Sequence, residues 1–304
     1  MSDGTRNQIT GGIFFSAVVQ GRDITVQLPP AVTPALSGLP AGSAAFTGRE
    51  DDLRRVLAPL APQALPAPRS RDTAAPTPVG AAVSGMAGVG KTELAVQTAR
   101  TALDDGWFPG GVLFVDLFGY DTARRVEPEV ALDGWLRALG IPGEHIPPGL
   151  QNRSRLFTSV LDTYAREGRR ILVVIDNAAS HEQAAPLLPA DGRTAAIVTS
   201  RHRLGMLNMR KVDIGVLPAE DAVTLLRRAM AILDPGDTRI EDHPGDAAAI
   251  ARLCGGLPLA LRIVAALLAD EPWPPRGGAV ARQGGFGGGG GGVLKPGADG
   301  VIAG

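Results

Sequence analysis

The chain has 304 residues, 44% of them hydrophobic, and a formal net charge of −1. This charge excludes a globally basic nucleic-acid binder, and the apolar content excludes an acidic disordered chain. A single cysteine, Cys254, excludes an internal disulfide and a cysteine-based metal site. The best apolar run, residues 256–269, is short for a membrane span and contains Arg262, and the N-terminus lacks the pattern of a secretion signal. We therefore expect a cytoplasmic protein without a membrane partner, in which direct nucleic-acid binding is not evident.

The first part of the chain, residues 7–27, is rich in strand-forming residues. Within it, IFFSAVVQ (residues 13–20) contains neither proline nor charge, which is the composition of a steric-zipper strand. The segment resembles bacterial amyloid-signalling motifs related to the RIP homotypic interaction motif, through Asn7, Gly11, Gly12 and VVQGRDI (residues 18–24). This resemblance implies amyloid-type pairing with an effector. A plain β-hairpin that docks on the rest of the protein is an equally open alternative.

Composition divides the chain into five parts. Residues 1–27 form the flexible β-prone segment, and residues 28–45 are a Pro/Ala-rich linker. Residues 46–217 alternate strand and helix patterns, and residues 218–271 carry only helical patterns. Residues 272–304 are too rich in glycine to bury a core, so we expect this tail to be disordered.

The alternating part predicts an α/β fold. Strands are expected at residues 79–84, 111–117, 171–176, 195–200 and 212–216. Helices are expected at residues 50–60, 92–103, 130–139 and 151–167, and again at 219–233, 246–254 and 257–269. Alternation of this kind is typical of a parallel sheet covered by helices on both faces, here followed by a small helical subdomain.

A glycine loop joins the first predicted strand of this part to a helix. The loop, SGMAGVGKT, has the spacing G-x-x-x-x-G-K-[ST], through Gly85, Gly90, Lys91 and Thr92. Glycines let successive amide N–H groups face phosphate oxygens, and the helix N-terminus adds its dipole. Lys91 supplies a compact mobile charge in a chain with only three lysines among 30 basic residues, and Thr92 offers a hydroxyl to Mg²⁺. The context predicts a P-loop nucleotide site.

A second feature supports this prediction. The buried strand in RRILVVIDNA ends in Asp176, which is where P-loop proteins place an acid that holds the metal. No [NT]-K-x-D guanine-reading tetrapeptide and no LSGGQ-like transporter signature occur in the chain. The sequence therefore favours ATP or ADP with Mg²⁺ over a guanine nucleotide.

Five segments in order resemble one family. They are FTGRE (46–50), the glycine loop, LVVIDNA (172–178), IVTSR (197–201) and GLPLA (256–260). Together they look like the NB-ARC type of STAND ATPases, the nucleotide switches of apoptosis and plant-immunity regulators, and above all like actinobacterial regulators that often carry tetratricopeptide repeats. The resemblance implies the parallel P-loop NTPase fold over about residues 46–270.

The resemblance also implies roles for individual residues. Phe46 would lie against adenine with Arg49 nearby, Arg201 would reach the γ-phosphate as a sensor, and Pro258 would pack on the base. It implies a sheet in which the strand before Arg201 lies between the strands that precede the glycine loop and Asp176. The complete set of nucleotide-binding candidates is Phe46, Arg49, Gly85, Gly88, Val89, Gly90, Lys91, Thr92, Glu93, Arg201 and Pro258. Thr92 and Asp176 are the metal candidates, and Lys91 and Asp176 the catalytic ones.

Two departures from the family bear on function. Asn177 stands where many relatives have a second acid, and an amide cannot take a proton from water. The chain also stops soon after the GLPLA segment, without the winged helix and repeats of the family, and His243 precedes that segment, so we expect it in a loop rather than as the winged helix's phosphate contact. The glycine tail reads as the end of a truncated or frame-shifted chain or as a linker.

The leading interpretation is an ATP/ADP signalling switch with slow or absent hydrolysis and nucleotide-dependent assembly, including homo-oligomers. One alternative is an active P-loop ATPase or kinase, for which Asp116 and Asp121 are possible acids, although turn or surface positions are the simpler expectation for both. Another is the ATPase module of a transcriptional regulator, which would need a separate DNA-binding domain.

Overall fold

The structure, a computed structural model, describes residues 38–62 and 79–271. The predicted amyloid-like segment (7–27), the first part of the predicted linker (28–37) and the glycine-rich tail (272–304) lie outside the described residues. In the part that is described, no helix combines the length and the apolar character needed to cross a membrane.

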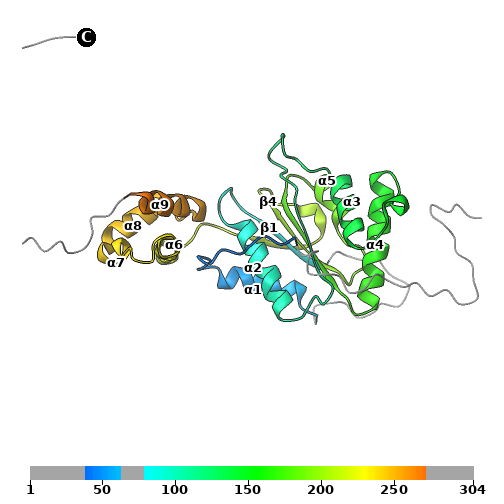
Figure 1. The fold of residues 1–304 in the computed structure, drawn as a ribbon, viewed down its shortest axis with the longest axis horizontal. Coiled ribbons are helices and arrows are strands. Elements are labelled where there is room, and N and C mark those ends of the chain that lie inside the picture. Colours follow the sequence, from blue (N-terminus) through cyan, green and yellow to red (C-terminus); the bar gives the residue numbers. More distant parts are fainter. Residues whose placement is uncertain (1–37, 63–78, 272–304) are drawn as a thin grey trace, which may run out of the picture. The chain divides into compact units, whose positions relative to one another are not determined.

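Five parallel strands form one sheet in the order β2-β3-β4-β1-β5 (Figure 1). The strands are β1 (Val79–Ser84), β2 (Gly111–Asp116), β3 (Ile171–Ala178), β4 (Ala195–Ser200) and β5 (Arg210–Asp213). The order confirms the expectation that β4 lies between β1 and β3. Because the strands are parallel, the glycine loop after β1, Asp176 of β3 and Arg201 after β4 meet at one edge of the sheet.

Helices cover both faces of this sheet, as the sequence predicts. The first two, α1 (Glu50–Leu57) and α2 (Lys91–Asp104), pack on one face, and α3 (Pro128–Ala138) and α4 (Leu150–Arg166) pack on the other (Figure 1). Successive residues of a strand point to opposite faces. Accordingly, Ala81 and Val83 of β1 belong to the core under α1 and α2, while Ala82 belongs to the core under α3 and α4.

Short helical segments connect these elements. They are α5 (His181–Ala184) and four 3-10 turns, η2 (Ala58–Leu60), η4 (Gly143–His145), η5 (Ala185–Leu187) and η6 (Gly205–Leu207). Leu60 and Leu187 are fully buried, so two of these turns contribute to the cores on the two faces of the sheet.

The chain after the sheet is helical, as predicted. It forms α6 (Ala219–Leu233), α7 (Arg239–Asp242), α8 (Pro244–Leu253) and α9 (Pro258–Asp270). These helices share a third core that includes Leu226 of α6 and Leu261 of α9, both with no exposed surface. Ala45, from the end of the predicted linker, is 3% exposed and belongs to the same core. The segment before α1 therefore packs against the helical region.

The last strand differs from its prediction. The apolar pattern predicts a strand at residues 212–216, but β5 covers Arg210–Asp213 and only Val212 of it is buried. The strand lies at the edge of the sheet, where polar side chains face water. Because Arg210 and Lys211 are exposed, the strand has no apolar run at its start, whereas the more apolar residues 214–217 lie beyond its end.

Candidate functional site

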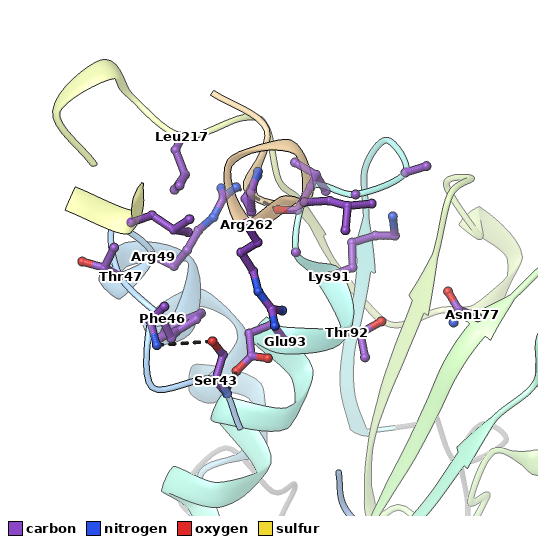
Figure 2. Close-up of a pocket in the computed structure, with 18 of the residues that line it drawn as sticks. Ser43, Phe46, Thr47, Arg49, Lys91, Thr92, Glu93, Asn177, Leu217 and Arg262 are labelled. Atoms are coloured by element: carbon purple, nitrogen blue, oxygen red, sulfur yellow. Dashed lines mark hydrogen bonds between the residues drawn. The ribbon is translucent and has the colours of Figure 1, made fainter. Parts of the chain in front are cut away.

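A cavity of about 310 Å³ lies where the glycine loop, the segment before α1 and the start of α9 come together (Figure 2). All predicted nucleotide-binding residues except Gly85 line it, namely Phe46, Arg49, Gly88, Val89, Gly90, Lys91, Thr92, Glu93, Arg201 and Pro258. Residues from four separate parts of the sequence thus surround one space of suitable size for a small ligand.

The glycine loop has the backbone that its sequence predicts. Gly88 has φ +74° and Gly90 has φ +97°, both in the region that favours glycine. Gly90 is the N-cap of α2, and Leu94 N is the first donor of the helix, bonding Gly90 O at 2.9 Å. The N–H groups of the first turn have no partner within the helix and present partial positive charge, which suits an anion.

Lys91 is buried at the base of this loop, with 6% of its surface exposed. Its Nζ donates to Gly85 O at 2.9 Å and to Met86 O at 2.8 Å, which leaves one of its three donors. Burial lowers the pKa of Lys91, the positive charge of Arg201 lowers it further, and the charge of Asp176 opposes both. The charges of Lys91 and Arg201 therefore repel each other, and an anionic ligand between them would offset this repulsion.

Asp176 has no exposed surface and accepts from three side chains at the end of β3. Thr92 Oγ1 lies 2.8 and 3.0 Å from its two carboxylate oxygens. Thr199 Oγ1 of β4 donates to the same carboxylate, and Asn177 Nδ2 lies 3.2 Å from it. The hydroxyl and the acid expected to hold Mg²⁺ are thus in direct contact, and their oxygens are of the kind that Mg²⁺ prefers.

Burial raises the pKa of Asp176, and this shift has a consequence for stability. As pH rises, the unfolded chain loses this proton before the folded protein does, so ionisation lowers the free energy of unfolding. We expect Asp176→Asn to melt at a higher temperature than wild type at pH 7 without nucleotide. The gain should disappear below the unfolded pKa of about 4. Thermal melts from pH 3.5 to 8 measure this, and a difference that does not change with pH would contradict it.

Asn177 follows Asp176 in the left-handed region, with φ +55°. Its Nδ2 donates to Asp116 Oδ1 at 3.0 Å, and its backbone N donates to Thr199 Oγ1 at 3.0 Å. Asp116, the last residue of β2, also accepts from Phe118 N at 2.8 Å. Asp121 accepts from Ala123 N at 3.1 Å and is a turn aspartate. Asn177 therefore takes part in a network that ties together the ends of β2, β3 and β4.

Arg49 is predicted to lie beside the nucleotide, but in the structure its guanidinium bonds other parts of the protein. It is 7% exposed, and its Nη2 donates to Val89 O at 3.0 Å and to Gly215 O at 2.6 Å. Its Nη1 bonds Asp52 at 3.0 Å. Arg49 lines the cavity, yet two of these three bonds connect the glycine loop to the chain after β5.

Glu93, in the first turn of α2, holds the segment before α1 through a hydrogen bond. Its Oε1 accepts from the backbone N of Ser43 at 2.7 Å and from Gln97 Nε2 at 2.8 Å. Phe46, three residues after Ser43, lines the cavity near Ser43 and Glu93 (Figure 2). The first turn of α2 therefore holds the segment that the family resemblance places against adenine.

The start of α9 touches the glycine loop directly. Leu259 N donates to Gly88 O at 3.2 Å, and a β-carbon built on Gly90 would lie 3.8 Å from Cγ of Pro258. In addition, Arg228 of α6 donates to Phe46 O at 2.7 Å. The helical region thus contacts both walls of the cavity. His243, at the junction of α7 and α8, is not among the lining residues, which agrees with its expected loop position.

Nine further residues line the cavity and are not among the nucleotide-binding residues predicted from the sequence. The further lining residues are Ser43, Ala45, Thr47, Ala87, Asn177, Leu217, Leu225, Leu259 and Arg262. Arg262 could have been found, because it lies four residues after Pro258 and therefore on the same face of α9. Figure 2 shows its side chain extending from α9 over the cavity. Ser43 carries no such signal, since it contributes through its backbone N.

Among curated proteins, regulatory proteins of Streptomyces are similar in sequence to this chain. The chain is 38% identical over 232 residues to Regulatory protein AfsR of Streptomyces coelicolor, covering 76% of this chain and 22% of that protein. It is 43% identical over 189 residues to the protein of the same name from Streptomyces griseus, covering 62% and 18%. No family model matches. The chain is homologous to AfsR-type regulators over most of its length and spans about a fifth of the length of these curated relatives.

Solved structures with a similar fold were also found. One is a STAND protein with a tetratricopeptide-repeat sensor from Pyrococcus horikoshii, at TM-score 0.43 and 18% identity, covering 77% of this chain and 31% of that one. Another is the ORC2 protein of Aeropyrum pernix in ADPNP–ADP complexes, at TM-score 0.43 and 15% identity, covering 75% and 70%.

Proposed function

We propose that this homologue of AfsR-type regulators is an adenine-nucleotide-binding signalling switch whose nucleotide state controls the contact between the glycine loop and α9. The observation that carries the proposal is the direct bond between Thr92 and buried Asp176 at the start of α2, beside Lys91. A hydroxyl, an acid and a lysine at the N-terminus of one helix are the set that binds a polyphosphate with its metal.

Each wall of the cavity has a role in this proposal. Lys91 and the first-turn N–H groups of α2 would bind the β- and terminal phosphates, and Mg²⁺ would be held by Thr92 and Asp176, where it neutralises phosphate charge. Arg201, which lines the same cavity, would contact a terminal phosphate through charge-assisted hydrogen bonds. Phe46 and Pro258 both line the cavity and supply apolar surface, which suits a base.

A switch function is supported by the contact between Leu259 and Gly88. A ligand shifts a conformational equilibrium only by as much as it binds one state better than the other. A nucleotide in this cavity would touch the loop and α9 at once, so its affinity depends on their separation. Nucleotide-dependent assembly with further copies or with an effector would follow from such movement. Pairing through residues 7–27, which lie outside the described residues, is part of the same hypothesis.

Hydrolysis is proposed to be slow or absent. The amide of Asn177 bonds Asp116 and Asp176 and cannot serve as a base toward water. The rival, an active ATPase or kinase, has one observation in its favour. Asp116 faces Asp176 in the register of β2 and β3, which places a second carboxylate near the site.

Nucleotide titration combined with turnover separates these functions. We expect the full chain to bind ATP and ADP in isothermal titration, with ATP binding enhanced by Mg²⁺ and GTP binding at least about ten-fold weaker. Turnover should stay below about 0.1 per second, far under the roughly 10 per second that is typical of enzymes. Turnover at that typical rate, lost in Asp116→Asn, would favour the enzyme instead. No binding of any nucleotide would contradict the proposed function altogether.

A further inference from the structure

Tyr120, in the loop that follows β2, contacts the ends of two further strands, β3 and β4, through its hydroxyl. The hydroxyl lies 3.1 Å from Ala178 O of β3 and 2.9 Å from Ser200 Oγ of β4, and it accepts from the backbone N of Arg201 at 2.8 Å. A phenol has one hydrogen and can accept two more bonds. Donation to Ala178 O, with acceptance from Ser200 and from Arg201, therefore uses it fully.

Ser200 completes the same network without a conflict. Its hydroxyl hydrogen can donate to Tyr120 while its oxygen accepts from the backbone N of His202 at 3.1 Å. The backbone on both sides of Arg201 is thereby held in place. The turn after β4 is fixed by a side chain from the loop after β2, 81 positions away from Arg201 in the sequence.

The ring of Tyr120 holds the side chain of Arg201 as well. Arg201 Cζ lies 4.2 Å from the centroid of this ring, a distance at which a guanidinium is attracted to an aromatic face. Arg201 lines the cavity, and its charge lowers the pKa of Lys91 across that space. The stacked guanidinium is thus kept within electrostatic range of the lysine that the proposed function places on the phosphates.

We propose that Tyr120 is the positioning residue for Arg201, and that it sets how strongly the protein prefers a nucleoside triphosphate over a diphosphate. The inference rests on the proposed function, because it assigns Arg201 to the terminal phosphate. An arginine free to rotate pays conformational entropy when it orders on a ligand. Tyr120 removes much of this cost in advance through two contacts, the hydroxyl on the backbone and the ring on the guanidinium.

Binding of ATP and ADP to Tyr120 variants tests the inference. We expect Tyr120→Leu to weaken ATP binding about 5- to 20-fold while ADP binding changes less than about 2-fold. Tyr120→Phe keeps the ring and should have a smaller effect. The logarithm of its ratio of ATP to ADP affinity should fall by less than half as much as in Tyr120→Leu. Arg124→Ala serves as the control, because Arg124 lies in the same loop, with its Cζ 3.8 Å from the ring centroid of Phe118, but outside the cavity lining. It should leave both affinities unchanged.

A double-mutant cycle with Arg201→Gln decides whether Tyr120 acts through Arg201. Arg201→Gln alone should reduce the ratio of ATP to ADP affinity, and Tyr120→Leu should then have no further effect on it. An equal loss of ATP and ADP affinity in Tyr120→Leu would overturn the inference, as would an undiminished effect in the Arg201→Gln background. In either case wild-type nucleotide binding would still support the proposed function, whereas failure of wild type to bind nucleotide would remove both.

Discussion

Lys91→Ala is expected to weaken binding of Mg-ATP at least about 100-fold, which corresponds to about 2.7 kcal/mol. A hydrogen bond to a charged group contributes about 1.5–3 kcal/mol, and Lys91 is the buried ammonium at the base of the glycine loop. ADP should lose affinity too, because the lysine would bind the β-phosphate. Isothermal titration with ATP and ADP measures both effects.

The same variant should remain folded, which separates a binding defect from unfolding. Burial lowers the pKa of Lys91 below that of the unfolded chain, so its charge reduces the free energy of unfolding at neutral pH. Without nucleotide, we therefore expect Lys91→Ala to melt no lower than wild type. Lys211→Ala removes an exposed lysine of β5 and is the matched control, with unchanged binding. Wild-type affinity in Lys91→Ala would refute the assignment of the phosphate site.

Gly80→Ala is expected to prevent the sheet from forming as described, at a cost above about 4 kcal/mol. Gly80, in β1, has φ +141°, a conformation that side chains disfavour. A β-carbon built there lies 1.8 Å from the carbonyl oxygen of Ala196, its partner in β4. Neither strand can yield, because β1 is paired on both sides and leads into the glycine loop. Circular dichroism and thermal melting of the soluble fraction measure the loss.

A second glycine in a regular element provides the control. Gly134 lies inside α3, and a β-carbon built there meets nothing within 4 Å. Gly134→Ala should raise the free energy of unfolding by about 0.5–1 kcal/mol, because alanine favours a helix and restricts the unfolded chain. A melting temperature for Gly80→Ala near that of wild type would show that β1 and β4 are not paired in this register.

Local sequence patterns predict most of the helices and strands of the fold. The spacing of Gly85, Gly90, Lys91 and Thr92 predicts the turn from β1 into α2, because glycine backbone freedom and a helix start are properties of neighbouring residues. Apolar runs located β1 to β4 within about two residues for the same reason. The edge strand β5 was displaced in the prediction, since exposed polar residues such as Lys211 leave no apolar pattern.

The site residues likewise divide into those that local motifs predict and those that depend on contacts between distant segments. Lys91, Thr92 and Asp176 could be named from motifs, and they come together at one edge because parallel strands end on the same side. Tyr120 and Ser43 could not be named, because each depends on a contact that spans many positions, with Arg201 and Glu93 respectively. The bonds that Arg49 makes to Val89 and Gly215 were hidden in the same way.

The amino-acid sequence alone therefore predicted the glycine loop, Asp176 and the succession of helices and strands along the chain. These features arise from short-range backbone preferences and from the periodicity of buried residues. Folding in three dimensions was needed to show which side chains hold the loop, the acid and Arg201 in place. Hydrogen bonds and ring contacts between distant segments depend on strand order and register, and no spacing within a single segment encodes them.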